Sequence, residues 1–357
     1  MNIAYLLPAP GIPVQGPSGS SAHARGVVQA LREEHEVHLF AARIEDHRGT
    51  FGADLDATEC GVPGWPSWLG RYRELTEVRS ARRIAKRVIA DAQRGWTPDL
   101  VVERHSLFSD AGWRIHDTLG TPWMLEVNAP AWAERERYEE LRRPAWARTW
   151  EGEVLRSAPV IVAVSRWLVR WLKEDVGCTN VHWVPNGVQP DTGDRARGRA
   201  LMKIGDEEPV VGFVGSFQPW HGTERLAGIA RAVGGRLVLV GAPDAQVEGA
   251  TRLGYRWGQD LADIIAAMDV ALAPYPADAP PWFCPLKVLD YRAQGTPIVG
   301  TDVGEVRALV GEGGTVVPPG DEDALCKAVQ AWIGQRVRPR VRSWQTVARE
   351  MFNAAGV

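Results

Sequence analysis

Long apolar runs are missing from this sequence. None of its 357 residues lies in an apolar run of about 18, the length that a membrane-spanning helix needs, so no transmembrane segment is predicted. The N-terminal run, MNIAYLLPAPGIPVQG, has no basic stretch before its apolar part and no small-residue cleavage site after it. We interpret it as a buried strand and not as a signal peptide, and we expect a cytoplasmic protein.

Paired cysteines and surplus positive charge are missing too. The four cysteines are scattered singly along the chain and form no Cys-x-x-Cys motif. This spacing argues against a structural zinc site and against a disulfide framework, and it predicts free thiols. The 41 basic residues are outnumbered by 44 acidic ones, for a net charge of −3. A chain with this balance has no overall attraction to a phosphate backbone, so no nucleic-acid partner is expected.

The sequence does contain a regular alternation of short apolar runs and amphipathic stretches. This pattern predicts the α/β class, with parallel sheets covered by helices on both faces. The length suits two domains. We predict Rossmann-like domains over residues 1–190 and 191–340, and a C-terminal helix within 341–357 that packs back on the first domain. Residues 191–205 carry several glycines and charges without a strand pattern, and they are predicted to be the linker.

Individual elements follow from the same alternation. The strands are expected at 2–7, 36–40, 99–103, 123–127, 160–164, 210–214, 236–240, 271–274 and 297–300. The helices are expected near 21–34, 71–93, 131–157, 166–174, 223–233, 285–294 and 343–354.

One segment in the second half concentrates chemically useful groups. Pro285 suits the first turn of a helix, and the free N–H groups of that turn form an anion site. Lys287 lies in the same turn, where the helix dipole disfavours a cation unless an anion is bound, and Asp290 follows on the same face. This row of N–H groups, ammonium and carboxylate suits a diphosphate followed by a ribose diol. The alternative is a solvated Lys/Asp pair on a surface helix, and the spacing alone favours neither.

The sequence around this segment resembles glycosyltransferase family 4, a retaining family with the GT-B fold. Cys284-Pro-Leu-Lys-Val-Leu-Asp-Tyr-Arg-Ala-Gln-Gly-Thr-Pro297 matches the family's Pro-Leu-Lys helix and the Gly-x-Pro strand after it. The further matches are Ala266–Tyr275, Gly254–Trp257, Val184–Val188, Ala163–Ser165, Asp99–Ser106 and Leu125–Pro130. The resemblance covers most of the chain and implies two Rossmann-like domains that face each other across a cleft.

The resemblance assigns a donor site to the second domain. It implies that Asp290 holds the ribose hydroxyls of a nucleotide-sugar. The other implied donor contacts in this domain are Gly215, Ser216, Gly254, Tyr255, Arg256, Cys284, Pro285 and Leu286. We expect Lys287 and His221 to act in catalysis by stabilising the leaving diphosphate, with His221 as an imidazolium whose pKa the diphosphate raises.

Three features depart from the family pattern. In the phosphate loop, Ser216 and His221 stand where the family has Arg and Lys. Trp282 replaces one of a pair of glutamates, and Asn128 replaces a histidine near the acceptor site. Each change removes a charge or a proton donor, which bears on donor affinity and turnover.

The first domain has a candidate donor loop between its first strand and first helix. Gly19 and Ser20 in this loop let the backbone approach the sugar and the diphosphate closely. Similar turns also serve packing alone. The loop is not a GxGxxG fingerprint, which argues against NAD.

Other polar residues of the first domain follow its strands. His105 and Asn128 are predicted at the sheet edge where ligands bind in open α/β folds, and both are candidates for catalysis beside the acceptor. A lone histidine at a strand end is more often structural. Glu126 is interpreted as a buried, hydrogen-bonded acid.

Two Asp-x-Asp triplets raise the question of a metal. Asp54-Leu-Asp56 lies in a predicted loop, and Asp321-Glu-Asp323 is better explained as an N-cap followed by acids of the first helical turn. We therefore predict neither a metal site nor a cofactor. Seven basic residues between Arg71 and Arg87 are interpreted as a solvated helix face. Contact with a membrane surface or an acidic acceptor is the alternative.

The leading hypothesis is a retaining, metal-independent glycosyltransferase. It moves a sugar from a nucleotide diphosphate-sugar to a hydroxyl of a small-molecule, glycan or lipid-linked acceptor. The resemblance implies front-side displacement, with the leaving phosphate taking the acceptor's proton. Two alternatives stay open: a GT-B relative such as a nucleotide-sugar epimerase or phosphorylase, and a non-catalytic sugar-nucleotide-binding partner, which the lost charges motivate.

Overall fold

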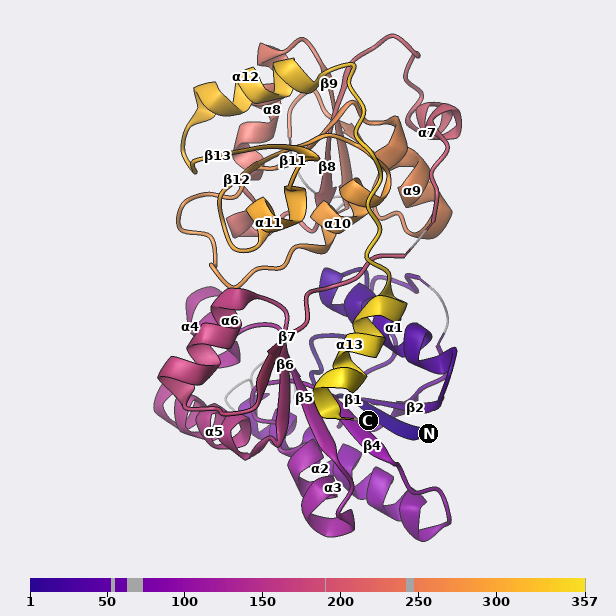
Figure 1. The fold of residues 1–357 in the computed structure, drawn as a ribbon, viewed down its shortest axis with the longest axis vertical. Coiled ribbons are helices and arrows are strands. Elements are labelled where there is room, and N and C mark those ends of the chain that lie inside the picture. Colours follow the sequence, from indigo (N-terminus) through magenta and orange to yellow (C-terminus); the bar gives the residue numbers. More distant parts are fainter. Residues whose placement is uncertain (53–54, 63–72, 190, 242–246, 357) are drawn as a thin grey trace. The chain divides into compact units, whose positions relative to one another are not determined.

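The computed structural model describes residues 1–52, 55–62, 73–189, 191–241 and 247–356. The chain forms two compact units, each with its own sheet flanked by helices (Figure 1). Unit 1 comprises Met1–Pro185 and Gln345–Val357, and unit 2 comprises Asn186–Trp344.

The sheet of unit 1 is parallel and, in the described part of the chain, has the strand order β3-β2-β1-β4-β5-β6-β7. Its strands are β1 (Asn2–Leu7), β2 (Glu36–Ala41), β3 (Thr58–Glu59), β4 (Leu100–Arg104), β5 (Trp123–Val127), β6 (Val160–Ala163) and β7 (Val181–Trp183). Strands β4 and β5 are buried along their whole length, which explains why they are mainly apolar without alternation. The order places the carboxyl ends of β1, β4 and β5 next to one another.

The helices of unit 1 are α1 (Gly19–Arg32), α2 (Arg73–Gln93), α3 (Ala111–Leu119), α4 (Ala131–Tyr138), α5 (Pro144–Ser157), α6 (Arg166–Trp171), the π-helical turn η2 (Leu172–Val176) and α13 (Trp344–Ala355). The single helix predicted over 131–157 is two helices. The break precedes Pro144, which suits the first turn of α5 because its missing N–H would have no partner there. In α13, the ring of Phe352 packs edge-on against His35 at 4.8 Å.

The sheet of unit 2 is also parallel, and among the described residues its order is β10-β9-β8-β11-β12-β13. Its strands are β8 (Val210–Gly215), β9 (Arg236–Gly241), β10 (Thr251–Arg252), β11 (Val270–Ala273), β12 (Ile298–Thr301) and β13 (Gly314–Val317). Its helical elements are α7 (Arg195–Met202), the 3-10 turns η3 (Pro219–His221) and η4 (Thr223–Arg225), α8 (Leu226–Ala232), α9 (Gly258–Ala267), α10 (Leu286–Ala293), α11 (Val306–Val310) and α12 (Glu322–Trp332).

The segment predicted as a linker, 191–205, contains helix α7. Asp194 caps it by accepting hydrogen bonds from the N–H groups of Ala196 and Arg197. Arg197 also forms a 2.6 Å ion pair with Asp263 of α9. A Cβ at Gly198 would collide with the carbonyl oxygen of Asp263, so the glycine lets α7 approach α9 closely. The charges that suggested a solvated linker therefore serve helix packing.

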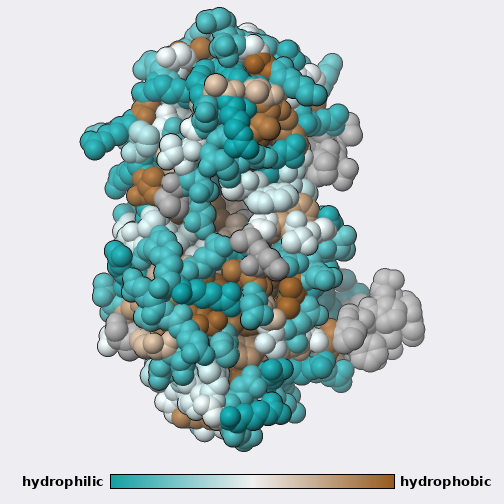
Figure 2. All heavy atoms as spheres, turned by 90° about the vertical axis from the view of Figure 1, so that its right-hand side faces the viewer, coloured by the Kyte–Doolittle hydropathy of each residue, from teal (hydrophilic) through white to brown (hydrophobic). Residues whose placement is uncertain are grey.

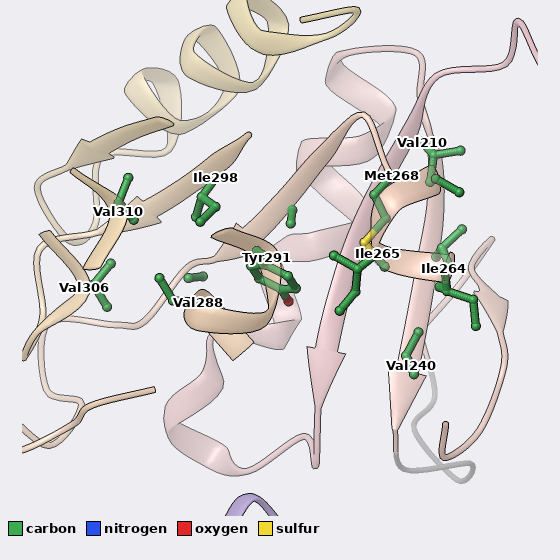
Figure 3. Close-up of a cluster of buried hydrophobic side chains, with 14 of the residues drawn as sticks. Val210, Val240, Ile264, Ile265, Met268, Val288, Tyr291, Ile298, Val306 and Val310 are labelled. Atoms are coloured by element: carbon green, nitrogen blue, oxygen red, sulfur yellow. The ribbon is translucent and has the colours of Figure 1, made fainter. Parts of the chain in front are cut away.

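One face of the unit 2 sheet is covered by a core that joins three helices (Figure 3). Ile264 and Ile265 come from α9, Tyr291 from α10, and Val306 and Val310 from α11. All five side chains are almost completely buried. This packing fixes α10, whose N-terminal turn carries the predicted anion site.

The two ends of unit 2 lie beside each other. Val188 and Ser343 form an isolated parallel bridge, and the Val188 N–H donates to the Arg342 carbonyl at 2.9 Å. The chain therefore enters and leaves unit 2 at one place.

One face of the molecule, shown in Figure 2, is covered mainly by hydrophilic side chains, with hydrophobic ones in small, separate patches. No helix among the described residues combines the length and the apolar character that crossing a membrane requires.

Candidate active site

The carboxyl edge of the unit 2 sheet brings several predicted donor residues together. Gly215 ends β8 and pairs in register with Gly241 at the end of β9. The Gly241 N–H donates to the carbonyl of Gly254 at 2.9 Å, and Tyr255 and Arg256 directly follow Gly254 in the chain. Residues that are far apart in the sequence therefore meet at the edge where parallel α/β sheets bind ligands.

Lys287 projects from the first turn of α10 into a buried aromatic setting. Its Nζ lies 4.0 Å from the centre of the Phe213 ring and 5.5 Å from that of Tyr275. No described residue gives this ammonium a hydrogen-bond partner. A Cβ at Gly215 would lie 2.8 Å from Nζ, so the glycine makes room for it. Burial lowers the pKa of Lys287 to about 7.

Asp290 lies one turn along the same helix and is partly buried. Burial raises the pKa of its carboxyl to about 7. Within the described ranges neither Asp290 nor Lys287 forms an ion pair. The alternative of a solvated pair on a surface helix is therefore wrong, because Lys287 is only 9% exposed. The start of α10 therefore presents an ammonium and a carboxyl, neither of which has an ion-pair partner among the described residues.

Tyr291 fixes the position of this helix against the sheet. Its ring is fully buried in the core (Figure 3). Its hydroxyl oxygen accepts a 2.8 Å hydrogen bond from the backbone N–H of Val214. Val214 directly precedes Gly215 in β8. The bond therefore sets the register that brings Lys287, one turn earlier, to the end of β8.

His221 closes the loop after β8, and its environment corrects the predicted imidazolium. Its Nδ1 accepts a 3.2 Å hydrogen bond from the Gln218 backbone N–H, as part of a capping box. Burial first, and Lys287 second, lower the pKa of His221 to about 2. The ring is therefore neutral, and because Nδ1 accepts, Nε2 carries the proton. His221 offers a neutral N–H donor and not a second cation.

The same loop is fitted tightly to the neighbouring strand. Gly222 has a φ of +66°, and a Cβ there would collide with the carbonyl oxygen of Pro274. Only glycine satisfies both demands at once. Ser216, which replaces the family's arginine, lies at the start of this loop and is partly buried.

The residues just before α10 contribute backbone groups, more than side chains, to the candidate site. Cys284 is buried, and burial raises the pKa of its thiol to about 12. Its carbonyl oxygen accepts a 2.7 Å hydrogen bond from Asn186 Nδ2, which links the Val184–Val188 motif to the α10 segment. Pro285 precedes the helix without a side-chain cap: the Val288 N–H donates to the Pro285 carbonyl at 3.2 Å, and no side chain caps the Leu286 and Lys287 N–H groups. Leu286 packs against the small cluster of Val188, Leu289 and Ala293.

The carboxyl edge of the unit 1 sheet carries the remaining predicted residues. Gly19 and Ser20 begin α1, whose N-cap is Ser18. Arg25, which no sequence pattern singled out, is buried on this helix and donates to the carbonyls of Val14 and Gly16 at 2.7 and 2.8 Å. It therefore anchors the loop that leads into α1.

Glu126 at the end of β5 confirms its interpretation as a buried, hydrogen-bonded acid. Its Oε1 lies 2.8 Å from Arg104 Nη1, 2.8 Å from His23 Nε2 and 2.6 Å from Asn128 Nδ2. Burial alone would raise its pKa, but these neighbours outweigh burial and lower it to about 2. Tyr5 donates to the other oxygen at 3.3 Å. Asn128 thus ends in a fixed cluster at the sheet edge.

His105 directly follows the carboxyl end of β4, but its side chain is buried there. Its side chain is only 3% exposed, and Nε2 is 2.8 Å from Glu151 of α5. The same carboxylate accepts from the N–H groups of Ala131 and Trp132 at 2.7 and 2.8 Å, so it caps α4. His105 therefore supports the loop after β5, as a lone histidine at a strand end more often does, and its role beside the acceptor stays a prediction.

The acidic triplets and the basic helix were the remaining sequence features. Asp321 is the N-cap of α12, as predicted, and accepts from the Ala324 N–H at 2.9 Å. Asp54 and Arg71 lie outside the described residues. Within the described ranges no three His, Cys, Asp or Glu side chains gather as metal ligands would.

The basic residues Arg82 and Lys86 of α2 line a hollow of about 210 Å³ beside α3.

Two family profiles match the chain. Residues 17–192 match the family described as Glycosyltransferase Family 4, and residues 208–335 match the family described as Glycosyl transferases group 1. The first match spans most of unit 1, and the second spans the sheet of unit 2 together with α10.

Curated relatives are glycosyltransferases. The GDP-mannose-dependent alpha-mannosyltransferase of Mycobacterium tuberculosis is 29% identical over 284 residues, 73% of this chain and 73% of that protein. The D-inositol 3-phosphate glycosyltransferase of Nocardia farcinica is 28% identical over 289 residues, 70% of this chain and 62% of that protein.

Solved structures share the fold at lower identity. Sucrose-phosphate synthase from Thermosynechococcus elongatus has a TM-score of 0.71 at 18% identity, over 99% of this chain and 94% of that one. Anabaena HepE in complex with UDP-glucose has a TM-score of 0.67 at 14% identity, over 100% of this chain and 99% of that one. The predicted fold class, α/β with two Rossmann-like domains, is confirmed. Profiles, relatives and fold agree, and the chain belongs to the family 4-like glycosyltransferases of the GT-B fold.

Proposed function

We propose that this nucleotide-sugar-dependent glycosyltransferase retains the anomeric configuration, works without a divalent metal, and binds the nucleoside diphosphate of its donor at the start of α10 in unit 2. The acceptor supplies a hydroxyl group. Lys287 meets the diphosphate, and Asp290 meets the ribose.

The observation that supports this most is the unpartnered Lys287 ammonium. A buried cation without a counter-charge is costly, so its environment favours a bound anion. The open N–H groups of the α10 start point to the same kind of ligand. A carboxyl one turn further along accepts hydroxyl hydrogens, which suits the sugar next to a diphosphate.

The proposed reaction exchanges one bond at the anomeric carbon for another on the same face. The bond from C1 to the β-phosphate oxygen breaks, and a bond from C1 to the acceptor oxygen forms. The acceptor's proton passes to the departing phosphate oxygen, so the products are a glycoside and a nucleoside diphosphate. Lys287, the helix N–H groups and the neutral Nε2–H of His221 stabilise the charge that develops on the leaving group.

The names of the similar proteins suggest which substrates to test first. The name of the mycobacterial relative includes GDP-mannose as its donor, and the Anabaena HepE structure is a complex with UDP-glucose. D-inositol 3-phosphate stands in the name of the Nocardia farcinica relative. We propose GDP-mannose and UDP-glucose as first donors and D-inositol 3-phosphate as first acceptor.

Calorimetric titration of the full chain tests the donor site. We expect GDP or UDP to bind more tightly than the matching monophosphate, and the monophosphate more tightly than the nucleoside. Lys287→Met should weaken the diphosphate more than the nucleoside, whereas Asp290→Asn should weaken both. Equal affinity of parent and variants would refute the assignment.

Transfer assays in excess EDTA test the chemistry. We expect turnover to persist in EDTA, and NMR of the glycoside to show the donor's anomeric configuration. Recovery of lost activity on adding Mg²⁺ or Mn²⁺ would contradict metal independence. Nucleotide release without a glycoside would favour an epimerase, and tight binding without turnover would favour a non-catalytic partner.

A further inference from the structure

The Lys287 ammonium lies against aromatic rings, where a buried cation would ordinarily have a carboxylate. Its Nζ is 4.0 Å from the centre of the Phe213 ring, a distance at which the negative π face of a ring attracts a cation. The Tyr275 ring lies 5.5 Å away. Among the described residues no acid pairs with Nζ. Within the described part of the chain, the rings therefore support this charge until a ligand binds.

The Phe213 ring is itself held in place by its neighbours. It is completely buried in the core beside β8. The rings of Phe217 and His221 meet it at steep angles, with centre-to-centre distances of 5.3 and 5.7 Å. Phe217 makes this contact at a φ of +57°, a conformation that is costly for a bulky side chain. A strained residue that packs against the ring indicates that the position of the ring matters.

Three titratable side chains near the ammonium are uncharged at neutral pH. Burial first, and Lys287 second, lower the pKa of His221 in η3 to about 2. Burial raises the pKa of Tyr275, near the end of β11, above its ordinary value, and it raises the pKa of Cys284, before α10, to about 12. Asp290 lies on the same helix as Lys287, and its pKa is about 7. The ring face of Phe213 therefore does not compete with a neighbouring anion of these three elements.

We propose that Phe213 is a positioning residue for the donor: its ring face holds the Lys287 ammonium at the end of β8, where the diphosphate binds. The inference rests on the proposed function and adds a residue to it. A carboxylate in the place of the ring would pair with the ammonium and repel the incoming diphosphate. A ring attracts the ammonium through its quadrupole but carries no net charge, so it holds the cation without opposing the anion.

Fluorination of the Phe213 ring tests the proposal, because fluorine withdraws electron density from the π face and barely changes the size of the ring. Phe213 is replaced in turn by phenylalanine analogues that carry one, two and three ring fluorines. Phe213→Leu removes the π face and keeps an apolar side chain. The matched control is the same series of analogues at Phe40, a phenylalanine buried in β2 of unit 1. These chains also carry Asp290→Asn, which removes the other group that titrates near pH 7.

The charge of Lys287 can be followed directly in the ligand-free protein, since the sequence has only five lysines: Lys86, Lys173, Lys203, Lys287 and Lys327. NMR of chains labelled with carbon-13 at lysine Cε gives the pH midpoint of each lysine, and Lys287→Met identifies one signal by its loss. We expect the Lys287 midpoint to fall with each added fluorine, by about one pH unit for three fluorines, the value of a desolvated cation–π contact. Phe213→Leu should lower it by a similar amount.

The Phe40 series should leave all five midpoints in place. Addition of GDP or UDP to the same samples should raise the Lys287 midpoint in every chain, because a bound diphosphate favours the ammonium.

The outcomes distinguish the positioning role from the proposed function. A graded fall of the Lys287 midpoint in the Phe213 series, with an unmoved Phe40 series, supports the positioning role, because a purely structural ring would not respond to fluorine number. Equal midpoints across the Phe213 series, or a similar fall in the Phe40 series, would overturn it and leave the proposed function intact. A Lys287 signal that neither nucleotide moves in the unsubstituted chain would count against the proposed donor site, and against the positioning role with it.

Discussion

The carboxyl edges of the two sheets handle buried charge in opposite ways. At the unit 1 edge, Glu126 has Arg104 and His23 within 2.8 Å. At the unit 2 edge, Lys287 and Asp290 have no ionic partner among the described residues. The neighbours of Glu126 lower its pKa to about 2, whereas burial moves both unit 2 groups to about 7.

This difference in charge pairing suggests that the unit 1 cluster supports the fold, whereas the unit 2 pair binds a ligand. The hydrogen bonds around Glu126 all form when the chain folds, so they can hold a side chain such as Asn128 in one orientation. Lys287 and Asp290 gain a charged or hydrogen-bonding partner only when a ligand binds. A bound anion then offsets the free-energy cost of burying the Lys287 ammonium. Substitutions at the two edges should therefore affect different properties, stability in unit 1 and ligand affinity in unit 2.

Removal of the central carboxylate of the unit 1 cluster should have the largest effect. Glu126→Ala leaves the buried Arg104 without its partner, so we expect a loss of about 3–5 kcal/mol in the free energy of unfolding of unit 1. Urea unfolding followed by circular dichroism measures it. Glu153→Ala, an exposed position on α5, is the control and should stay within about 0.5 kcal/mol of the parent. A loss as small as that of the control would mean that the cluster is not a support.

Removal of the Lys287 charge in unit 2 should leave the stability of the fold unchanged and weaken nucleotide binding. Lys287→Met removes a buried charge that has no partner among the described residues, so we expect the ligand-free melting temperature to stay level or rise. Affinity for GDP or UDP should fall roughly 10- to 100-fold, the value of a charge-assisted hydrogen bond to phosphate. Thermal melts and calorimetry measure the two effects. Lys327→Met on the exposed face of α12 is the control. Lost stability with retained affinity would reverse the assigned roles.

The unit 2 pair should also make binding pH-dependent. Because burial lowers the pKa of Lys287 to about 7, the free protein is mainly uncharged there at pH 8. A bound diphosphate raises the pKa again, so binding at pH 8 takes up close to one proton, and affinity falls as pH rises above 7. At pH 6 the ammonium is already present and the uptake disappears.

Calorimetry in two buffers of different ionisation enthalpy counts these protons. The Asp290→Asn background removes the second group that titrates near pH 7. Equal proton uptake in Lys287→Met and in its parent would show that another group is responsible.

His221 should give the smallest effect and none on the pH profile. Its pKa of about 2 means that the ring stays neutral from pH 5 to 9, so it donates one neutral hydrogen bond throughout. His221→Ala should weaken diphosphate binding by about 2- to 10-fold. The pH at which affinity declines should not move, as titration of the variant at several pH values will show. A shifted midpoint would restore the imidazolium that the sequence suggested.

Local rules were enough to predict from the sequence the helix start that carries the candidate site of unit 2. Pro285 and the spacing of Lys287 and Asp290 predict a helix start with an ammonium and a carboxyl on one face, and the structure has this helix. Strand ends were predictable to within one or two residues, because buried parallel strands are short apolar runs. The roles of the individual site residues stay predictions.

The sequence could not show what depends on distant neighbours. His23 and Arg104 reach Glu126 from other elements, and no periodicity connects the three. Helix α7 was missed because its arginines look solvated, whereas Arg197 pairs with Asp263 of α9. The charge state of His221 depends on burial, which exists only after the fold brings Lys287 beside it.

The paired ends of unit 2 bear on the order in which the protein matures. Since Val188 and Ser343 lie together, unit 2 is an insertion between two pieces of unit 1. Unit 1 is therefore completed only by α13, which follows unit 2 in the chain and whose Phe352 packs against His35. The first piece of unit 1 is made before unit 2, so the apolar surface that α13 covers stays open to other contacts until α13 has been synthesised.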